Sequence, residues 1–434
     1  MAVADATDEV PVSVSPLTGT KAGPGNGQPV VMLALATVGF AVNFWAWALL
    51  SPLGTHYKDL LSLSGSQQAL LVAVPVIVGS LGRIPVGGLT DRFGGRVMFP
   101  LVSVVTIVPV LFIGLAGQRS FVGLLIGGFF LGVAGTIFAV GVPFVNAWFP
   151  PQRRGLAIGV FGVGMGGTAI SALTTVKLVT ARGSTAPFLI TAVALVLYAA
   201  LAWVLMRDAP GRTVPTEPLG ARLAATARLS ITRQACILYA VAFGGYVAFS
   251  VYLPTYLKTA YGLSQADAAN RMAGFVLLAV VMRPVGGWLS DRLGPVPVLT
   301  GVYAVLTAAA AAQSFTPDLM PLGTIAFLTM AGALGAGSGA TFALVAQAAP
   351  ASKVGAVTGL VGAAGGLGGF VPPLVMGVIH GVFGSYGFGL ALLALVAAST
   401  MVFTMTVVRS TAVSRVAHAS RPPESAGSPA SSTV

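Results

Sequence analysis

Apolar residues along this chain form long runs that are separated by short polar stretches. A membrane-spanning helix needs about 20 mainly apolar residues, and the chain has twelve such runs. The pattern predicts an all-α membrane protein with twelve transmembrane helices in two six-helix halves, residues 30–206 and 234–408. The runs cover residues 30–52, 70–89, 97–116, 121–149, 155–178, 187–206, 234–257, 271–289, 297–315, 320–348, 355–380 and 387–408.

The polar remainder consists of two tails and a central linker. Residues 1–29 and 409–434 are rich in proline, glycine, serine or charges, and we expect them to be disordered cytoplasmic tails. Residues 207–233 contain five arginines and several prolines, so we expect a basic cytoplasmic linker between the halves. With both tails on one side, most Lys and Arg residues outside the runs also fall on that side. The positive-inside rule then places both termini in the cytoplasm of a bacterial inner membrane.

Composition agrees with a multi-pass membrane protein. The chain is 56% hydrophobic and 8% charged, whereas a soluble domain is about a quarter charged. Its net charge of +12 does not indicate a nucleic-acid partner, because the basic residues cluster between apolar runs. The single cysteine, Cys236, excludes a disulfide framework and a structural zinc site. We expect no metal and no cofactor.

The two halves repeat with an offset of 200 residues. A Gly-x-x-x-Asp-Arg-x-Gly segment at 87–94 returns at 287–294, and it resembles the loop signature of the major facilitator superfamily. A carboxylate and an arginine at a helix end can pair with neighbouring spans, so we expect a conformational latch; the alternative is a tight turn with solvated charges. The latch residues would be Asp91, Arg92, Asp291 and Arg292.

Arg83 and Arg283 occupy equivalent positions inside the second and eighth runs. Arg83 lies roughly 10 Å below Thr90 at the predicted membrane edge, at 1.5 Å per residue. An arginine at that depth costs several kcal/mol unless it faces a cavity or a partner, and the predicted spans contain no Asp or Glu. We therefore expect a planar oxyanion between the two guanidinium groups. The alternative is that they snorkel or bind carbonyls of broken helices.

Other candidate residues lie near the same depth. The fifth and eleventh runs contain doubled glycines, which weaken helices and either pack helices or expose backbone to a small ligand. Pro372-Pro373 is expected to break or kink the eleventh span. A buried-looking amide, Asn43, either donates to the anion or joins helices. The predicted site comprises Arg83, Arg283, Phe138, Tyr239, Phe243, Asn43, Gly164, Gly167, Gly366 and Phe342.

Residues 43–52, Gly82-Arg83, Phe138 before Trp148-Phe149-Pro150, and the two glycine-rich spans resemble the nitrate/nitrite porter (NarK-type) branch of the major facilitator superfamily. The resemblance covers nearly all of 30–408. It implies that nitrate binds between the paired arginines beside the aromatic residues, and that the halves rock for alternating access. The branch commonly has asparagine where this chain has Ile137 and Met165, which leaves the balance between nitrate and nitrite open.

We therefore expect a secondary transporter of nitrate and nitrite, and not an enzyme, that works as a monomer in the lipid bilayer. Anion import opposes an inside-negative potential by about 2.3 kcal/mol per 100 mV. Exchange of nitrate for nitrite balances the charge. For proton-coupled uptake the candidate titratable groups are His56 and His380, with Lys177 behind them, but we favour interfacial positions for the two histidines. Symport with a proton carried by water or linked to an arginine stays open. The alternatives are a porter for another small or organic anion, such as a phosphate ester or carboxylate, and a receptor that binds without transport.

Overall fold

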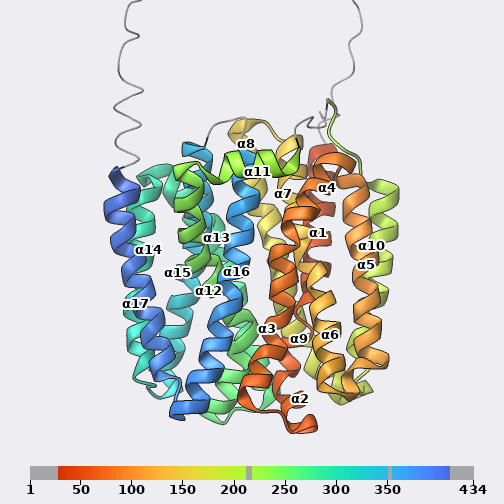
Figure 1. Cartoon of the computed structure of the whole chain (residues 1–434), viewed down its shortest axis with the longest axis vertical. Helices are drawn as coiled ribbons and strands as arrows, with labels where there is room; N and C mark the ends of the chain where they lie inside the picture. The colour runs from red at the N-terminus through yellow and green to blue at the C-terminus, as the bar shows by residue number, and fades with distance from the viewer. Residues whose placement is uncertain (1–27, 212–217, 350–353, 411–434) are drawn as a thin grey trace, which may run out of the picture.

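The computed structural model describes residues 28–211, 218–349 and 354–410, and these residues form one helical bundle (Figure 1). Within this part of the chain, twelve segments are long and apolar enough to cross a membrane. The twelve predicted spans are thereby confirmed. We call the end of the bundle where α1 begins the tail end, and the opposite end the α2 end (Figure 1).

Helices of the N-terminal half are often divided in two. The first, second, fourth and fifth spans each contain a turn of 3-10 helix or a break. The elements are α1 (Gln28–Trp47), α2 (Gly54–Leu61), α3 (Gly65–Leu81), α4 (Arg83–Phe93), α5 (Gly95–Leu115), α6 (Phe121–Leu131), η3 (Gly132–Thr136), α7 (Ile137–Trp148), α8 (Pro151–Gly162), η4 (Val163–Gly166), α9 (Gly167–Arg182) and α10 (Ala186–Leu205).

Helices of the C-terminal half are more continuous, and several extend beyond the predicted runs. The seventh span begins inside the predicted linker, because the polar end of a helix can continue past the hydrocarbon layer. A short amphipathic helix, α11, precedes this span. The elements are α11 (Leu219–Ala227), α12 (Ser230–Tyr261), α13 (Gln265–Leu293), α14 (Pro295–Ser314), η5 (Leu319–Gly323), α15 (Thr324–Ala348), α16 (Val354–Phe383), α17 (Gly387–Phe403) and η7 (Thr404–Val408).

Helix α16 passes through Pro372 and Pro373 without interruption. The break expected in the eleventh span is therefore wrong, and the kink that was its alternative stays a prediction. A helical proline crowds the carbonyl four residues earlier, which here belongs to Gly368 and Gly369. Neither has a side chain that adds to the crowding. Both glycines also press α16 against α12: a Cβ at Gly368 would lie 2.3 Å from the Ala240 carbonyl oxygen. This packing supports the helix through the prolines.

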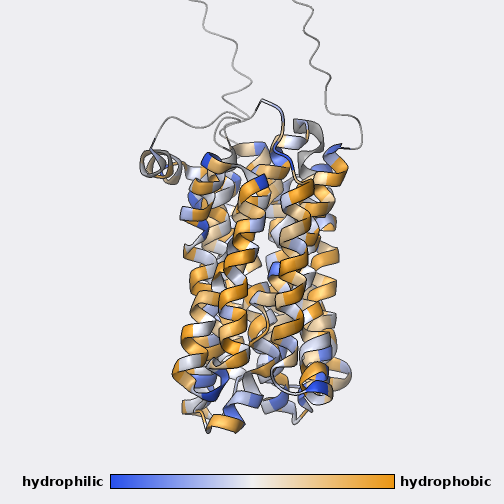
Figure 2. Ribbon diagram, turned by 90° about the vertical axis from the view of Figure 1, so that its right-hand side faces the viewer, coloured by the Kyte–Doolittle hydropathy of each residue, from blue (hydrophilic) through white to orange (hydrophobic). Residues whose placement is uncertain are grey.

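The helices consist largely of hydrophobic residues along the middle of the bundle (Figure 2), and many large apolar side chains are exposed. Exposed examples include Val108 at 69% and Leu197 at 65% of full exposure. A surface this apolar would aggregate in water, whereas lipid tails solvate it. Buried polar residues lie inside instead, among them both arginines. This distribution, with apolar residues outside and polar residues inside, therefore agrees with a multi-pass membrane protein.

The two halves are joined by polar contacts at the α2 end. The Ser51 hydroxyl donates to the carbonyls of Ser250 and Val251 at 3.0 and 2.8 Å. The Gln68 amide donates to the Thr255 hydroxyl at 3.1 Å, and Lys258 pairs with Asp59 at 2.8 Å. These contacts close the interface between the halves at the α2 end.

Glycines fix the crossing of α13 and α15, which carries Arg283. A Cβ at Gly339 would lie 1.9 Å from the Arg283 carbonyl oxygen, and one at Gly335 would lie 2.1 Å from the Ala279 carbonyl oxygen. These contacts are between backbones and cannot be relieved by a rotamer change. Close approach of small residues is the usual basis of helix pairing in membranes.

We predict that Gly335→Ala destabilises the protein by about 1–3 kcal/mol, because its new methyl group overlaps the Ala279 carbonyl. The measurement is the melting temperature of the purified protein in detergent. Gly332→Ala on the same helix is the matched control, since its Cβ would lie 3.8 Å from the Met282 side chain. Equal melting temperatures for the two variants would contradict the close crossing.

Candidate functional site

Arg83 begins α4 directly after the break at Gly82 and is only 5% exposed. Position 82 has room only for glycine, because a Cβ there would lie 2.5 Å from the Val78 carbonyl oxygen and 2.9 Å from Thr136. The Arg83 guanidinium donates through Nε to the Gly135 carbonyl at 3.3 Å and through Nη1 to the Gly362 carbonyl. Its partners are therefore a carbonyl of the 3-10 segment η3 and a carbonyl of the opposite half.

Arg283 lies on the unbroken helix α13 and is 4% exposed. Its Nη2 donates to the Tyr239 hydroxyl of α12 at 2.7 Å, and its Nη1 contacts the Met165 sulfur of η4. A thioether is a weak acceptor, so this contact satisfies the donor poorly. Tyr239 accepts from Arg283 and keeps its own hydroxyl hydrogen for another acceptor.

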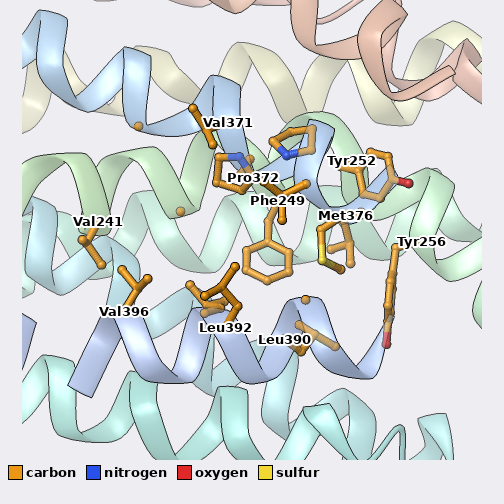
Figure 3. A pocket seen from close by; sticks show the side chains of 18 of the residues that line it. Val241, Phe249, Tyr252, Tyr256, Val371, Pro372, Met376, Leu390, Leu392 and Val396 are labelled. Carbon is orange, nitrogen blue, oxygen red and sulfur yellow. The ribbon is translucent and has the colours of Figure 1, made fainter. Parts of the chain in front are cut away.

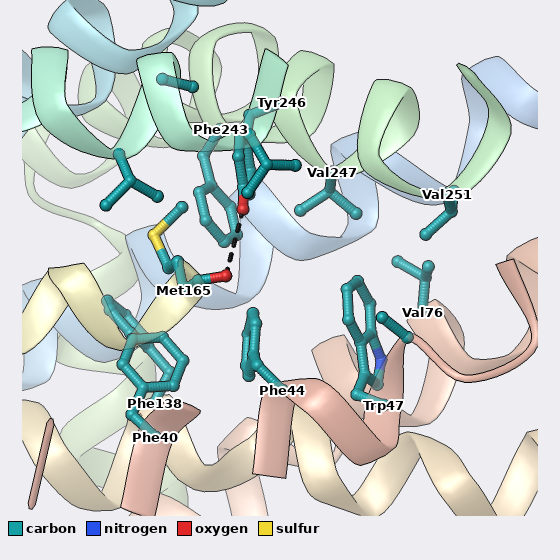
Figure 4. Close-up of a cluster of buried hydrophobic side chains, with 14 of the residues drawn as sticks. Phe40, Phe44, Trp47, Val76, Phe138, Met165, Phe243, Tyr246, Val247 and Val251 are labelled. Carbon is teal, nitrogen blue, oxygen red and sulfur yellow. Dashed lines mark hydrogen bonds between the residues drawn. The ribbon is translucent and has the colours of Figure 1, made fainter. Parts of the chain in front are cut away.

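Both guanidinium groups lie over the same two aromatic rings. Arg83 Cζ is 5.2 Å from the Phe138 centroid and 5.6 Å from the Phe243 centroid. For Arg283 Cζ the distances are 6.0 and 5.7 Å. Phe342 and Tyr239 border Arg283 as well, at 5.6 and 5.8 Å. Phe138 and Phe243 stack at 6.4 Å between the halves and lie in the buried cluster of Figure 4. The rings bring the two charges to one place.

Each arginine reaches a glycine of the opposite half. Arg83 donates to the Gly362 carbonyl on α16, and a Cβ at Gly162 on α8 would lie 3.5 Å from both Cδ and Nε of Arg283. Gly162 and Gly362 are themselves related by the offset of 200 residues. The internal repeat therefore becomes a pseudo-twofold arrangement in which both guanidinium groups cross the interface between the halves.

The surroundings of both arginines are neutral. None of the ion pairs recorded in the described part of the chain involves Arg83 or Arg283. Carbonyls, a phenol, a thioether and ring faces satisfy some of the donors but neutralise none of the charge. An arginine fork suits a planar oxyanion with two acceptor oxygens. The arrangement is therefore a candidate site for a small anion.

Several predicted residues belong to this cluster, namely Arg83, Arg283, Phe138, Tyr239, Phe243, Phe342 and Gly366. Gly366 borders Arg83, since a Cβ there would lie 3.3 Å from Arg83 Nη1. The contacts of three others are with α1 and α5. Gly164 and Gly167 pack on α1, where added Cβ atoms would lie 2.6 Å from Phe40 Cβ and 2.0 Å from the Ala41 carbonyl oxygen. The Asn43 amide donates to Ser103 of α5 at 2.9 Å.

Sequence reasoning overlooked the roles of Gly135, Gly162 and Gly362 as neighbours of the arginines. Their common signal is weak, because glycine is frequent throughout these spans. Met165, noted only as a departure from the family pattern, lies beside Arg283. Its carbonyl also accepts from the Tyr246 hydroxyl at 3.4 Å, which joins η4 to α12 (Figure 4).

The repeated Asp-Arg segments end α4 and α13 at the tail end. Gly94 and Gly294 take φ values of +83° and +85°, a left-handed conformation that favours glycine. Arg92 lies 5.5 Å from the Phe93 ring, and Arg292 lies 4.2 Å from the Trp288 ring. The glycines explain the sharp turn at both places. The latch formed with Asp91 and Asp291 stays a prediction.

An apolar cavity of about 210 Å³ lies away from the arginines, between α12, α16 and α17 (Figure 3). Its lining includes Phe249, Pro372 and Met376. Val371 and Leu392 on its rim are 55% and 43% exposed on the outside of the bundle. This cavity therefore faces the lipid side and has no charged residue in its lining.

Twelve spans in two repeated halves, with a charged site buried where the halves meet, define a membrane transporter and not an enzyme. The family model described as "Major Facilitator Superfamily" matches residues 36–373. The chain belongs to this superfamily, and its relatives confirm the resemblance to the nitrate/nitrite porter branch.

Three relatives illustrate the match. The "Probable nitrate/nitrite transporter NarK2" of Mycobacterium tuberculosis is 51% identical over 376 residues, which cover 86% of this chain and 95% of the relative. The "Nitrite extrusion protein" of Bacillus subtilis is 34% identical, and the match covers 86% of this chain and 93% of the relative. The "Probable nitrate/nitrite antiporter NarK1" of Thermus thermophilus is 32% identical, and the match covers 70% of this chain and 69% of the relative.

Solved structures support the fold alone. The Escherichia coli fucose:proton symporter aligns with a TM-score of 0.65 at 16% identity, covering 87% of this chain and 98% of the symporter. A bacterial homologue of the human lysosomal transporter Spinster, in an inward-facing and occupied conformation, aligns with a TM-score of 0.64 at 20% identity, covering 92% and 98%. Both comparisons confirm the predicted fold class.

We predict that Gly366→Ala weakens nitrate binding at least tenfold, because the new methyl group would lie 2.3 Å from Ser80 Oγ and 3.3 Å from Arg83 Nη1. Its equivalent, Gly166→Ala, is the matched control, since a Cβ there meets no described atom within 4 Å. The measurement is the shift in melting temperature over a nitrate titration. Equal affinities for the two variants would place the anion elsewhere.

Proposed function

We propose that this protein carries nitrate and nitrite across the bacterial cytoplasmic membrane by alternating access, with the anion held between Arg83 and Arg283. One observation carries the proposal: two buried guanidinium groups from opposite halves lie over the same two rings without a recorded ion-pair partner. The names of the relatives support the choice of anion. The anion supplies the negative charge that the described surroundings of the arginines lack.

The crowding of the site favours a small anion over a phosphate ester or carboxylate. A Cβ at Gly365 would lie 2.2 Å from the Tyr239 ring, and one at Gly362 would lie 2.9 Å from the Phe138 ring. The site therefore has no spare room for even a methyl group at these positions. Nitrate and nitrite are compact and planar, and each offers oxygens to both forks.

The arrangement of the halves supports alternating access. Polar contacts close the α2 end, through Ser51 with Ser250 and Asp59 with Lys258. We infer a conformation closed at the α2 end, with the tail end and both termini on the cytoplasmic side. Rocking would break the α2-end contacts and expose the arginines to the other side.

Exchange of one anion for another suits this site better than a cycle in which the halves rock back without a bound anion. Two uncompensated guanidinium groups in a low-dielectric interior are costly, so the halves should rock most easily when an anion is bound. The candidate proton carriers lie elsewhere: His56 is on α2, and His380 stacks on Tyr386 at 4.3 Å near the α2 end. We therefore favour nitrate/nitrite exchange over proton-coupled uptake.

Labelled nitrate should enter proteoliposomes faster when nitrite is trapped inside, because exchange moves no net charge. Arg83→Lys and Arg283→Lys should each lower the rate at least tenfold, since a lysine cannot form the two-pronged contact and each charged hydrogen bond contributes about 1.5–3 kcal/mol. The measurement is initial uptake at matched protein content.

Arg271→Lys serves as the control for these variants. It lies on the same helix α13, but it pairs with Asp267 at 3.3 Å near the α2 end, and it should transport normally. A rate of nitrate uptake that is the same with and without trapped nitrite would contradict exchange. Wild-type activity in both Arg83→Lys and Arg283→Lys would contradict the binding site.

Rocking is tested with a reversible cross-link at the α2 end. In a Cys236→Ala background, Asp59→Cys with Lys258→Cys and a short thiol-reactive linker should abolish transport, because the halves could no longer separate there. Reduction of the linker should restore transport, and neither single-cysteine variant should respond. Full transport by the cross-linked protein would contradict the opening of this end.

A further inference from the structure

Ser80 on α3 carries a buried hydroxyl that has no hydrogen-bond partner among the residues that the structure describes. The residue is only 1% exposed and lies three positions before Arg83. Serine hydroxyls inside these helices usually donate to the carbonyl four residues earlier, as Ser338 does to Leu334 and Ser290 does to Gly286, both at 2.8 Å. Ser80 does not make this local bond. A buried hydroxyl without a partner is unfavourable, so another acceptor is expected at this position.

The Ser80 hydroxyl points to the same place as the Arg83 guanidinium. A Cβ at Gly366 would lie 2.3 Å from Ser80 Oγ and 3.3 Å from Arg83 Nη1. The two donors therefore lie on the same side of the Gly366 backbone. Their separation cannot exceed the sum of these distances, and one oxyanion can span it with two hydrogen bonds of ordinary length. Gly366 has no side chain that could separate them.

The internal repeat shows that this hydroxyl belongs to one half only. The residue equivalent to Ser80 is Val280, which is buried and has no polar atom in its side chain. In the C-terminal half the hydroxyl beside the arginine comes from Tyr239, whose equivalent in the other half is Gly39. Each guanidinium group therefore has one neighbouring hydroxyl, but the two hydroxyls come from different helices.

We propose that the Ser80 hydroxyl donates a hydrogen bond to the anion held by Arg83 and is a substrate-binding residue of this transporter. This inference rests on the function proposed above. The ligand is an inorganic oxyanion of the size of nitrate or nitrite, with one oxygen facing Ser80 and Arg83 and another facing Tyr239 and Arg283. The hydroxyl is satisfied only when the anion is bound, so it contributes to the preference for the loaded site.

Ser80→Ala tests the proposal because binding and structural roles predict opposite effects on stability. In the binding role, loss of a hydrogen bond to a charged ligand should raise the KM for nitrate and nitrite about tenfold, with the maximal rate retained. The anion-free protein should melt at the same or a higher temperature, since an unsatisfied hydroxyl is removed. Ser338→Ala, which removes a buried hydroxyl bonded within its own helix, should leave KM unchanged.

Three outcomes are distinguishable in proteoliposome uptake and in anion-dependent melting of the purified protein. A raised KM with unreduced anion-free stability supports the proposal. An unchanged KM for both anions, or a lower anion-free melting temperature without a change in KM, overturns the role of Ser80 and leaves the proposed function standing. Failure of the wild-type protein to bind or move either anion overturns both.

Discussion

Two positive charges buried without a recorded ion-pair partner impose the strictest constraint on this structure. Arg83 and Arg283 are each at most 5% exposed, and none of the ion pairs in the described residues reaches them. An isolated charge at this depth costs several kcal/mol. Carbonyls of Gly135 and Gly362, the Tyr239 hydroxyl and four aromatic rings lower that cost. In the proposed function, a bound anion completes the compensation.

The same constraint connects binding to motion. Arg83 contacts Gly362, and Arg283 lies against Gly162, so each charge reaches across the interface between the halves. An anion between the two forks is therefore held by both halves at once. A ligand can shift a conformational equilibrium only through different contacts in the two states. In the proposed mechanism, rocking changes the distance between the forks, which would give the anion such a difference.

The sequence was sufficient for the features that are linear or repeated. Long apolar runs predicted the twelve spans, and the 200-residue offset paired Arg83 with Arg283. Features that depend on which face of a helix meets which neighbour could not be predicted. Gly164 packs on α1 whereas Gly366 borders Arg83, although both lie in similar glycine runs. Likewise α16 stays helical through Pro372 because of its packing on α12. Ser80 was indistinguishable from many helix serines until its missing partner was seen.

The most direct test of the paired-arginine site is an experimental structure of the protein determined with nitrate. We expect a planar density feature between Arg83 and Arg283, beside the Phe138 and Phe243 rings, within hydrogen-bond distance of both guanidinium groups. We also expect Arg283 Nη1 to turn from the Met165 sulfur to the anion. Arginines that keep only the protein partners described above, with nitrate bound elsewhere or absent at saturating concentration, would contradict the central claim.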